Sequence, residues 1–186
     1  MRYIKDEEFL RGDTPMTKEE VRILSLSKLD IEPNSVLLDI GAGTGSVAVQ
    51  MSKLCPEGKV IAIEKEEDAL ELILKNKEKF HCNNLQIIKG EALEVEKHID
   101  IIFDGIFIGG SGGNLEEIIK AYAKKLKPNG KMVFNFISLK NLSTATNTLK
   151  ALDFKFTISQ ISVSKVKGEH QMLFANNPIF ILEAWR

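Results

Sequence analysis

Three glycines at alternate positions follow a short apolar stretch that contains a single aspartate. The apolar stretch is 36–40, and the loop after it is made of Gly41, Ala42, Gly43, Thr44 and Gly45. Glycine lets a backbone approach a ligand where any Cβ would collide. A helix that begins directly after the loop offers free N–H groups and the positive end of its dipole to an anionic group. These residue types predict a site for a nucleotide-like cofactor.

An acidic residue, Glu64, ends the next apolar run, about 20 residues beyond the glycines, which is the offset of an acid that binds ribose hydroxyls. The carboxyl ends of neighbouring parallel strands meet beside the crevice where ligands bind, so we expect Glu64 to lie next to the loop. The plainer alternative is a glycine-rich turn needed only for packing, with Glu64 as a solvated strand end.

The glycine pattern is G-x-G-x-G, and Ser46 stands where the dinucleotide fingerprint has its third glycine. This departure counts against NAD or FAD. On these residues alone, an NAD-binding oxidoreductase and a non-catalytic nucleotide-binding domain both remain open. We expect no metal site, because the three histidines are dispersed without ligand spacing: His81, His98 and His170.

The elements that must position these residues alternate between strand and helix. Apolar strand patterns are expected at 36–40, 60–63, 85–88, within 99–108 and at 132–137. A helical pattern precedes the first of these strands and follows each of them except the third. This alternation predicts a Rossmann-like, doubly wound, mostly parallel sheet in a three-layer α/β/α arrangement. Two final β-rich stretches, 154–163 and 178–185, bring the strands to seven. Joined by a polar linker, they should pair as a hairpin and place one antiparallel strand in the edge region.

The bulk composition narrows the setting. A chain of 186 residues that is 44% hydrophobic suits a single domain, 1–186, with its own core. The net charge of −1 implies no basic face, so nucleic acid is not an expected partner. Cys55 and Cys82 are isolated in the sequence, which predicts a reduced, cytoplasmic protein. No apolar run is long enough to suggest a membrane span.

The pattern D-I-G-x-G-x-G with an acid after the second strand resembles the class I S-adenosylmethionine-dependent methyltransferases, over about residues 35–186. The resemblance implies that the loop 41–45 holds the methionine part of the cofactor and that Glu64 holds the ribose. It also implies that the segment containing Glu91 and Ala92 lies against the adenine. Aspartate is expected where Glu91 stands, which leaves the backbone of Ala92 as the firmer adenine contact.

Longer blocks are similar to a narrower family, the decarboxylating precorrin methyltransferases of cobalamin biosynthesis. The matching blocks are DEEFLR at 6–11, PMTKEEVR at 15–22, DIGAGTGSV at 39–47, FIGGSGG at 107–113 and NPIFI at 177–181. They span almost the whole chain. The resemblance implies methylation of carbon-15 of cobalt-precorrin-6B, with loss of carbon dioxide from the ring C acetate at carbon-12, to give cobalt-precorrin-7. A stand-alone chain favours the cobalt-containing substrate, but residues do not determine the metal state.

The same resemblance assigns Thr17 to the cofactor. Thr17 is also the expected N-cap of the first helix, in a capping box with Glu20. The glycine-rich stretch 109–113 suits a flat macrocycle that lies against the backbone, and the N–H groups of this stretch could bind a carboxylate. The expected substrate-binding residues in it are Gly109, Gly110, Ser111 and Gly112. Arg11 is the expected partner of a substrate carboxylate.

No protein residue is assigned a catalytic role, because the conjugated macrocycle can act as the electron sink for decarboxylation. A class I methyltransferase acting on another small molecule, on protein or on RNA remains an alternative. The absence of an N/D-P-P-Y block after the fourth strand argues against DNA or glutamine amide methylation. The resemblance also implies a homo-oligomer, a tetramer. Within each chain we expect residues 1–34 to cover the site and 35–186 to form the sheet core.

Overall fold

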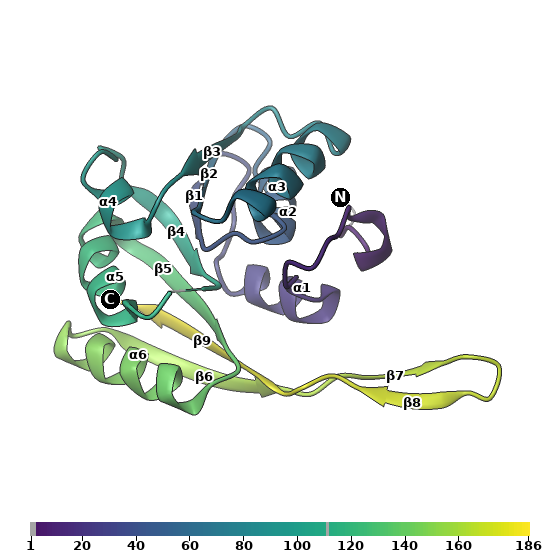
Figure 1. Cartoon of the computed structure of the whole chain (residues 1–186). Helices are drawn as coiled ribbons and strands as arrows, with labels where there is room; N and C mark the ends of the chain where they lie inside the picture. Colours follow the sequence, from purple (N-terminus) through teal and green to yellow (C-terminus); the bar gives the residue numbers. More distant parts are fainter. Residues whose placement is uncertain (1–2, 111) are drawn as a thin grey trace.

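A seven-stranded sheet forms the centre of the protein (Figure 1). The structure is a computed structural model, and it describes residues 3–110 and 112–186. The strands lie in the order β3-β2-β1-β4-β5-β9-β6. Their bounds are β1 Val36–Ile40, β2 Lys59–Glu64, β3 Leu85–Lys89, β4 Phe103–Ile108, β5 Leu126–Phe136, β6 Lys155–Ile161 and β9 Ile179–Trp185.

Helices cover both faces of this sheet (Figure 1). On one side lie α1 Glu19–Ser27, α2 Ser46–Leu54 and α3 Glu67–Lys79, and on the other α4 Ala92–Glu96, α5 Leu115–Tyr122 and α6 Leu139–Ala151. Two short 3-10 turns lie at Asp6–Glu8 and Ala123–Lys125. Each face of the sheet has its own buried apolar cluster. The predicted three-layer, doubly wound fold is confirmed.

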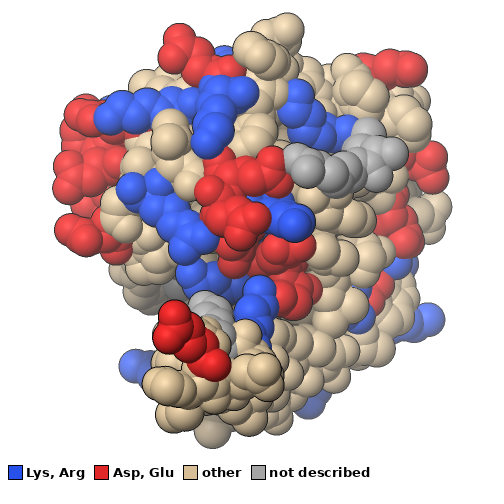
Figure 2. All heavy atoms as spheres, turned by 90° about the vertical axis from the view of Figure 1, so that its right-hand side faces the viewer, with Lys and Arg blue, Asp and Glu red and all other residues tan. Residues whose placement is uncertain are grey.

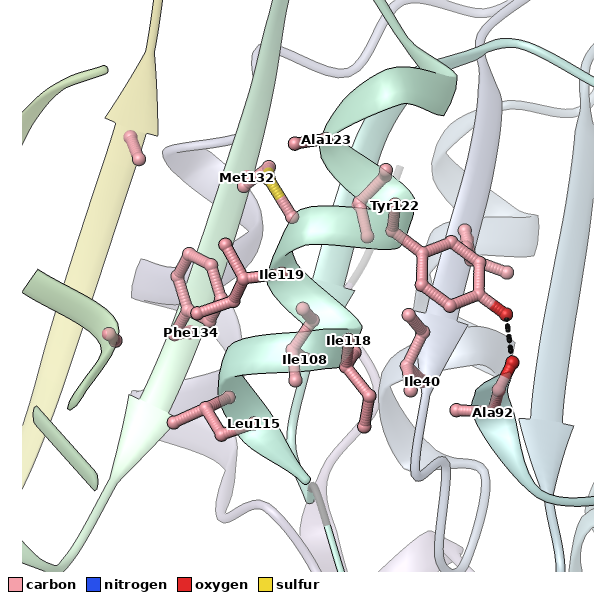
Figure 3. Packing of buried hydrophobic residues seen from close by; sticks show 14 of the residues in the cluster. Ile40, Ala92, Ile108, Leu115, Ile118, Ile119, Tyr122, Ala123, Met132 and Phe134 are labelled. Carbon is pink, nitrogen blue, oxygen red and sulfur yellow. Dashed lines mark hydrogen bonds between the residues drawn. The ribbon is translucent and has the colours of Figure 1, made fainter. Parts of the chain in front are cut away.

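The apolar stripe of α5 packs flat on the sheet (Figure 3). Ile118, Ile119 and Tyr122 are fully or almost fully buried, and the Tyr122 hydroxyl donates a hydrogen bond of 2.7 Å to the carbonyl of Ala92. Because a buried hydroxyl needs a partner, this bond fixes the start of α4 against α5. Tyr122 therefore belongs to the core, and it helps to position the end of a strand–helix loop.

The antiparallel strand lies in the edge region of the sheet, as predicted, one place in from the edge itself. β9 pairs antiparallel with both β5 and β6, so it lies between them, and β6 is the edge strand. The predicted pairing of the two C-terminal stretches is confirmed, but the prediction that a polar linker joins them is wrong. The segment between them is a second hairpin, formed by β7 Ser164–Lys167 and β8 Met172–Ala175, which projects from the body of the molecule (Figure 1). We call residues 164–175 the arm.

The start of α1 also differs from the prediction. Lys18, not Thr17, is the N-cap residue, and it makes no side-chain capping hydrogen bond. Glu20 instead forms an ion pair with Lys165 in the arm, at 2.5 Å between Oε1 and Nζ. The carbonyl of Thr17 accepts a hydrogen bond of 2.7 Å from Arg22 Nη1. The predicted capping box is wrong: with Lys18 as the N-cap, Glu20 is the second residue of the helix and not the third, and its carboxylate pairs with Lys165.

Candidate active site

Two adjoining cavities open at the carboxyl ends of the parallel strands. The larger measures about 710 Å³ and the smaller about 170 Å³. Gly41, Glu64 and Gly110 line both. The larger volume lies in the range of small-molecule sites, and its position is the one where open α/β sheets bind ligands.

The glycine loop is enclosed by two other backbone segments. Gly41 has φ +70° and Gly43 has φ +56°, both in the left-handed region that favours glycine. A Cβ at Gly41 would lie 2.7 Å from the carbonyl oxygen of Gly110, and one at Gly43 would lie 3.2 Å from the carbonyl oxygen of Pro15. The loop after β1 thus meets the loop after β4 and the N-terminal segment, so side chains are excluded where a ligand must approach backbone.

Glu64 fastens this loop to β2. Its Oε2 accepts a hydrogen bond of 2.8 Å from the N–H of Gly43, and its Oε1 accepts from the N–H groups of Lys65 and Glu66 at 2.8 and 3.0 Å. The side chain is largely buried and borders both cavities. The sequence predicted that Glu64 lies beside the glycines, but not that its carboxylate holds the loop in place.

Asp39 is a cavity-lining residue that sequence reasoning did not assign to the site. It is 0% exposed, and within the described chain no side chain donates a hydrogen bond to either carboxylate oxygen and no cation pairs with them. Burial raises the pKa of Asp39 to about 7, with the N–H of Ala48 offsetting part of the rise and nearby Glu64 adding to it. The signal was present in the sequence as a single carboxylate within an otherwise apolar strand.

The N-terminal segment forms one wall of the larger cavity. Residues 13–17 line it, including Thr17. Arg22 holds this segment from behind: its fully buried guanidinium donates to the carbonyls of Ile4 and Thr17 at 2.6 and 2.7 Å and to the Asp6 carboxylate at 3.1 Å. A buried cation with three partners at this point links the chain start to the site.

The structure places the other predicted residues unequally. Glu91 and Ala92 line the smaller cavity, and Glu91 caps α4 by accepting the N–H of Leu93 at 2.8 Å. Thr44 is a buried residue of the glycine loop itself. Gly45 is the left-handed N-cap of α2. Gly109 and Gly110 line the larger cavity and Gly112 lines the smaller one, while Ser111 lies outside the described residues.

Arg11 is not brought to the cavities. It is exposed, and its Nε donates a hydrogen bond of 3.2 Å to the carbonyl of Asp6. It is not among the described residues that line either cavity. The arginine that holds the N-terminal segment is Arg22, and the sequence did not indicate that Arg22 is buried while Arg11 is exposed.

The charge of the larger cavity is negative. Its charged lining residues, as far as the structure describes them, are all acids: Asp13, Asp39, Glu64, Glu66 and Asp68. Lys65 lines only the smaller cavity. A low-dielectric pocket of this sign favours a ligand that carries positive charge.

Comparisons with known proteins agree with this geometry. Residues 8–186 match the family model of the precorrin methyltransferase domain. A probable cobalt-precorrin-6B C(15)-methyltransferase (decarboxylating) of Sulfurisphaera tokodaii is 44% identical, over 96% of this chain and 95% of that protein. The cobalt-precorrin-6B C(15)-methyltransferase (decarboxylating) of Salmonella typhimurium is 39% identical, over 96% of this chain and 94% of that protein. A crystal structure of precorrin-6y C5,15-methyltransferase from Geobacter metallireducens superposes with a TM-score of 0.95 at 38% identity, over 99% and 96%.

The chain belongs to the precorrin methyltransferase family. The predicted family is confirmed, and the oxidoreductase and the non-catalytic nucleotide-binding alternatives fall away. S-adenosylmethionine is the methyl donor of this class of enzyme, and the site fits it on two observations. The unpaired, buried carboxylate of Asp39 suits a cationic group, and a Cβ would fill the cradle at Gly41. The other predicted cofactor residues Thr17, Glu64, Glu91 and Ala92 also line the two cavities.

Neither a membrane-spanning helix nor a metal-binding cluster is present in the part of the chain that the structure describes. No helix there is both long and apolar enough to cross a membrane. In the same part of the chain, His, Cys, Asp and Glu side chains form no group of three or more that could hold a metal ion.

Proposed function

We propose that this methyltransferase methylates carbon-15 of cobalt-precorrin-6B and removes carbon dioxide from its ring C acetate, giving cobalt-precorrin-7. The observation that carries this proposal is the contact between Gly41 and Gly110. It joins a cofactor loop and a glycine-rich loop into one cavity without intervening side chains, which suits a flat substrate beside the cofactor. The names of the relatives from Sulfurisphaera tokodaii and Salmonella typhimurium support the same reaction.

A small-molecule substrate is also favoured by the surface. On the face shown in Figure 2, Lys and Arg side chains are interspersed with Asp and Glu, and no continuous basic stripe crosses it. Nucleic-acid binding relies on clustered positive charge. This face therefore gives no support to an RNA substrate.

The residues of the site act mainly by positioning. When bound, S-adenosylmethionine supplies an electrophilic methyl group. Glu64 and the glycine loop fix its place, Asp39 holds positive charge, and Gly109, Gly110 and Gly112 leave room for the macrocycle. Holding reactants in line contributes much of the rate of such a transfer. The substrate-binding role of Arg11 requires movement toward the cavity and remains a proposal.

The test is a reaction of the purified protein with cobalt-precorrin-6B and S-adenosylmethionine, followed by mass spectrometry. We expect a product that has gained one methyl group and lost one carbon dioxide. Metal-free precorrin-6B in a parallel reaction shows which metal state is preferred. If the folded protein binds S-adenosylhomocysteine but changes neither substrate, the proposed reaction is wrong.

Glu64→Ala should weaken cofactor binding about 10- to 100-fold, because hydrogen bonds to a charged acceptor are lost and the loop loses its tie at Gly43. Glu64→Gln keeps the shape and one acceptor, so it should lose less. Titration calorimetry with S-adenosylhomocysteine measures both variants. Glu117→Ala removes an exposed carboxylate from α5 and serves as the matched control. Unchanged affinity in Glu64→Ala would refute the ribose role.

We also propose that residues 1–186 act as one domain, with 1–34 covering the site, in the cytoplasm. The lining of the larger cavity by residues 13–17 supports the covering role. Cys55 and Cys82 are free, buried thiols, as expected of a protein from a reducing compartment.

The arm supports a homo-oligomer, which we propose to be a tetramer. Four large apolar side chains on it are exposed by more than half: Val166 (62%), Met172 (60%), Leu173 (68%) and Phe174 (54%). In the described structure β7 and β8 pair only with each other, so each has an open outer edge. Apolar side chains on an open-edged ribbon are a docking surface for another chain.

Leu173→Lys should shift the protein toward smaller species, because a charge then replaces an apolar contact between copies. Light scattering coupled to size exclusion measures the mass against the 20.8 kDa of one chain. Leu74→Lys alters a comparably exposed leucine on α3, away from the arm, and should leave the mass unchanged. A wild-type protein that runs as a monomer at micromolar concentration would contradict the proposal.

A further inference from the structure

Asn135, near the end of β5, has a side-chain donor with no partner among the described residues. It pairs with Ile181 of β9 and lines both the larger cavity and a small hollow beside it. The Ser25 hydroxyl of α1, itself fully buried, donates to Asn135 Oδ1 at 2.9 Å. The amide nitrogen Nδ2 is buried, and no described residue accepts its hydrogens.

The Ser25 hydrogen bond fixes what this amide can do. Because Oδ1 is already an acceptor for Ser25, the group that remains for a ligand is the NH₂ donor. Buried donors without a partner are rare in folded proteins and each calls for an explanation. A ligand atom that accepts a hydrogen bond supplies one.

We infer that Asn135 is a substrate-positioning residue that donates a hydrogen bond to the acetate carboxylate lost in the reaction. The inference rests on the proposed function and deepens it. Among the described side chains that line the larger cavity, Asn135 is the only one with N–H donors, and all the charged ones are acidic. The acidic side chains of this cavity therefore repel a substrate carboxylate, whereas the amide of Asn135 can donate a hydrogen bond to it. Phe107, Ile137 and Ile179, which also line this cavity, carry no polar side-chain atom that could compete as a donor.

A neutral donor also suits the chemistry. In decarboxylation the bond between the methylene carbon and the carboxyl carbon breaks, and carbon dioxide leaves without charge. The electron pair passes into the conjugated ring, where carbon-15 takes up the methyl group as a cation. The macrocycle then releases one proton, and the methylene carbon takes up one proton from water to become a methyl group. A lysine or arginine would bind the carboxylate more tightly than the transition state, in which that negative charge is dispersing, and would slow the step. A neutral amide orients the carboxylate but stabilises its negative charge less, so it slows the decarboxylation less than a cation would.

The test compares two macrocycles in equilibrium titrations: cobalt-precorrin-6B, and an analogue with a methyl group at carbon-12 in place of the acetate. Asn135→Asp keeps the acceptor for Ser25 but replaces the donor with an oxygen. We expect it to lose about 10- to 100-fold in affinity for the acetate-bearing substrate. It should bind the analogue and S-adenosylhomocysteine as the wild type does. Asn147→Asp, on the exposed surface of α6, makes the same chemical change away from the cavities and should alter none of these.

Three other outcomes overturn specific statements. Equal loss for both macrocycles, or weaker S-adenosylhomocysteine binding, assigns Asn135 a structural role and refutes the inference. If Asn135→Asp does not fold, Asn135→Ala is measured in the same way and must show the same discrimination. A wild-type protein that binds neither macrocycle and forms no product refutes the proposed function itself, whereas an active wild type with an unaffected Asn135→Asp refutes only the role of Asn135.

Discussion

Arg22→Ala is expected to lower the free energy of unfolding by about 3–5 kcal/mol, the range for breaking a buried, hydrogen-bonded charge cluster by removing one partner. The guanidinium is fully buried, spans the carbonyls of Ile4 and Thr17, pairs with Asp6 and lies 4.8 Å over the ring of Phe9. Without it, two buried carbonyls lose their donors and the wall containing Thr17 loses its support. Urea unfolding measures the stability, and calorimetry with S-adenosylhomocysteine measures the secondary loss of cofactor affinity.

Two further arginine variants test whether the buried hydrogen-bond network of Arg22 causes the loss of stability. Arg22→Lys keeps the charge, but a single ammonium on a flexible stem cannot reproduce the planar fork, so we expect an intermediate loss. Arg11→Ala removes an exposed arginine from the same segment and should change the stability by less than about 0.5 kcal/mol. Equal effects at Arg11 and Arg22 would show that the buried network does not hold the segment.

Asp39→Asn is expected to have opposite effects on stability and on cofactor binding. The pKa of Asp39 is raised to about 7 by burial, so the folded protein keeps a proton that the unfolded chain releases near pH 4. The wild type therefore loses stability as pH rises from about 4 to about 7. The variant lacks this loss, so above pH 7 it should be more stable by roughly 2–4 kcal/mol without ligand. Near pH 4 the two proteins should unfold alike.

The same variant should bind S-adenosylmethionine at least about 100-fold more weakly at pH 8, because a buried anion that would face positive charge is gone. In the wild type, affinity should rise with pH through about 7 as Asp39 ionises, and this slope should vanish in Asp39→Asn. Urea unfolding and calorimetry between pH 4.5 and 8 measure the two effects. Asp100→Asn, on the exposed surface, removes a charge of the same kind as a control. A pH-dependent affinity that persists in Asp39→Asn would assign the titration to another group.

Much of the architecture could be predicted because it depends on local periodicity. The alternation of apolar runs determined the order of strands and helices, and the adjacency of Glu64 and the glycine loop follows from parallel strands that end on the same side. The blocks at 15–22 and 107–113 indicated the family. The prediction that failed concerns the stretch 164–175, whose polar residues are typical of a linker. Its two strands pair through a turn at 168–171 that the apolar pattern did not indicate.

The amino-acid sequence by itself determined the fold class, because the periodicity of strands and helices is a short-range property. It indicated the cofactor and the family through the resemblance of its longer blocks to known methyltransferases. Only the tertiary structure decided which charged and polar groups are buried and which have partners. Arg11 and Arg22 are alike as residue types, yet one is exposed and the other is enclosed by three acceptors. Asp39 and Asn135 became site residues only when packing left their polar atoms unpaired beside a cavity. Burial and pairing depend on contacts between residues far apart in the chain, such as Ser25 with Asn135, and no local pattern records them.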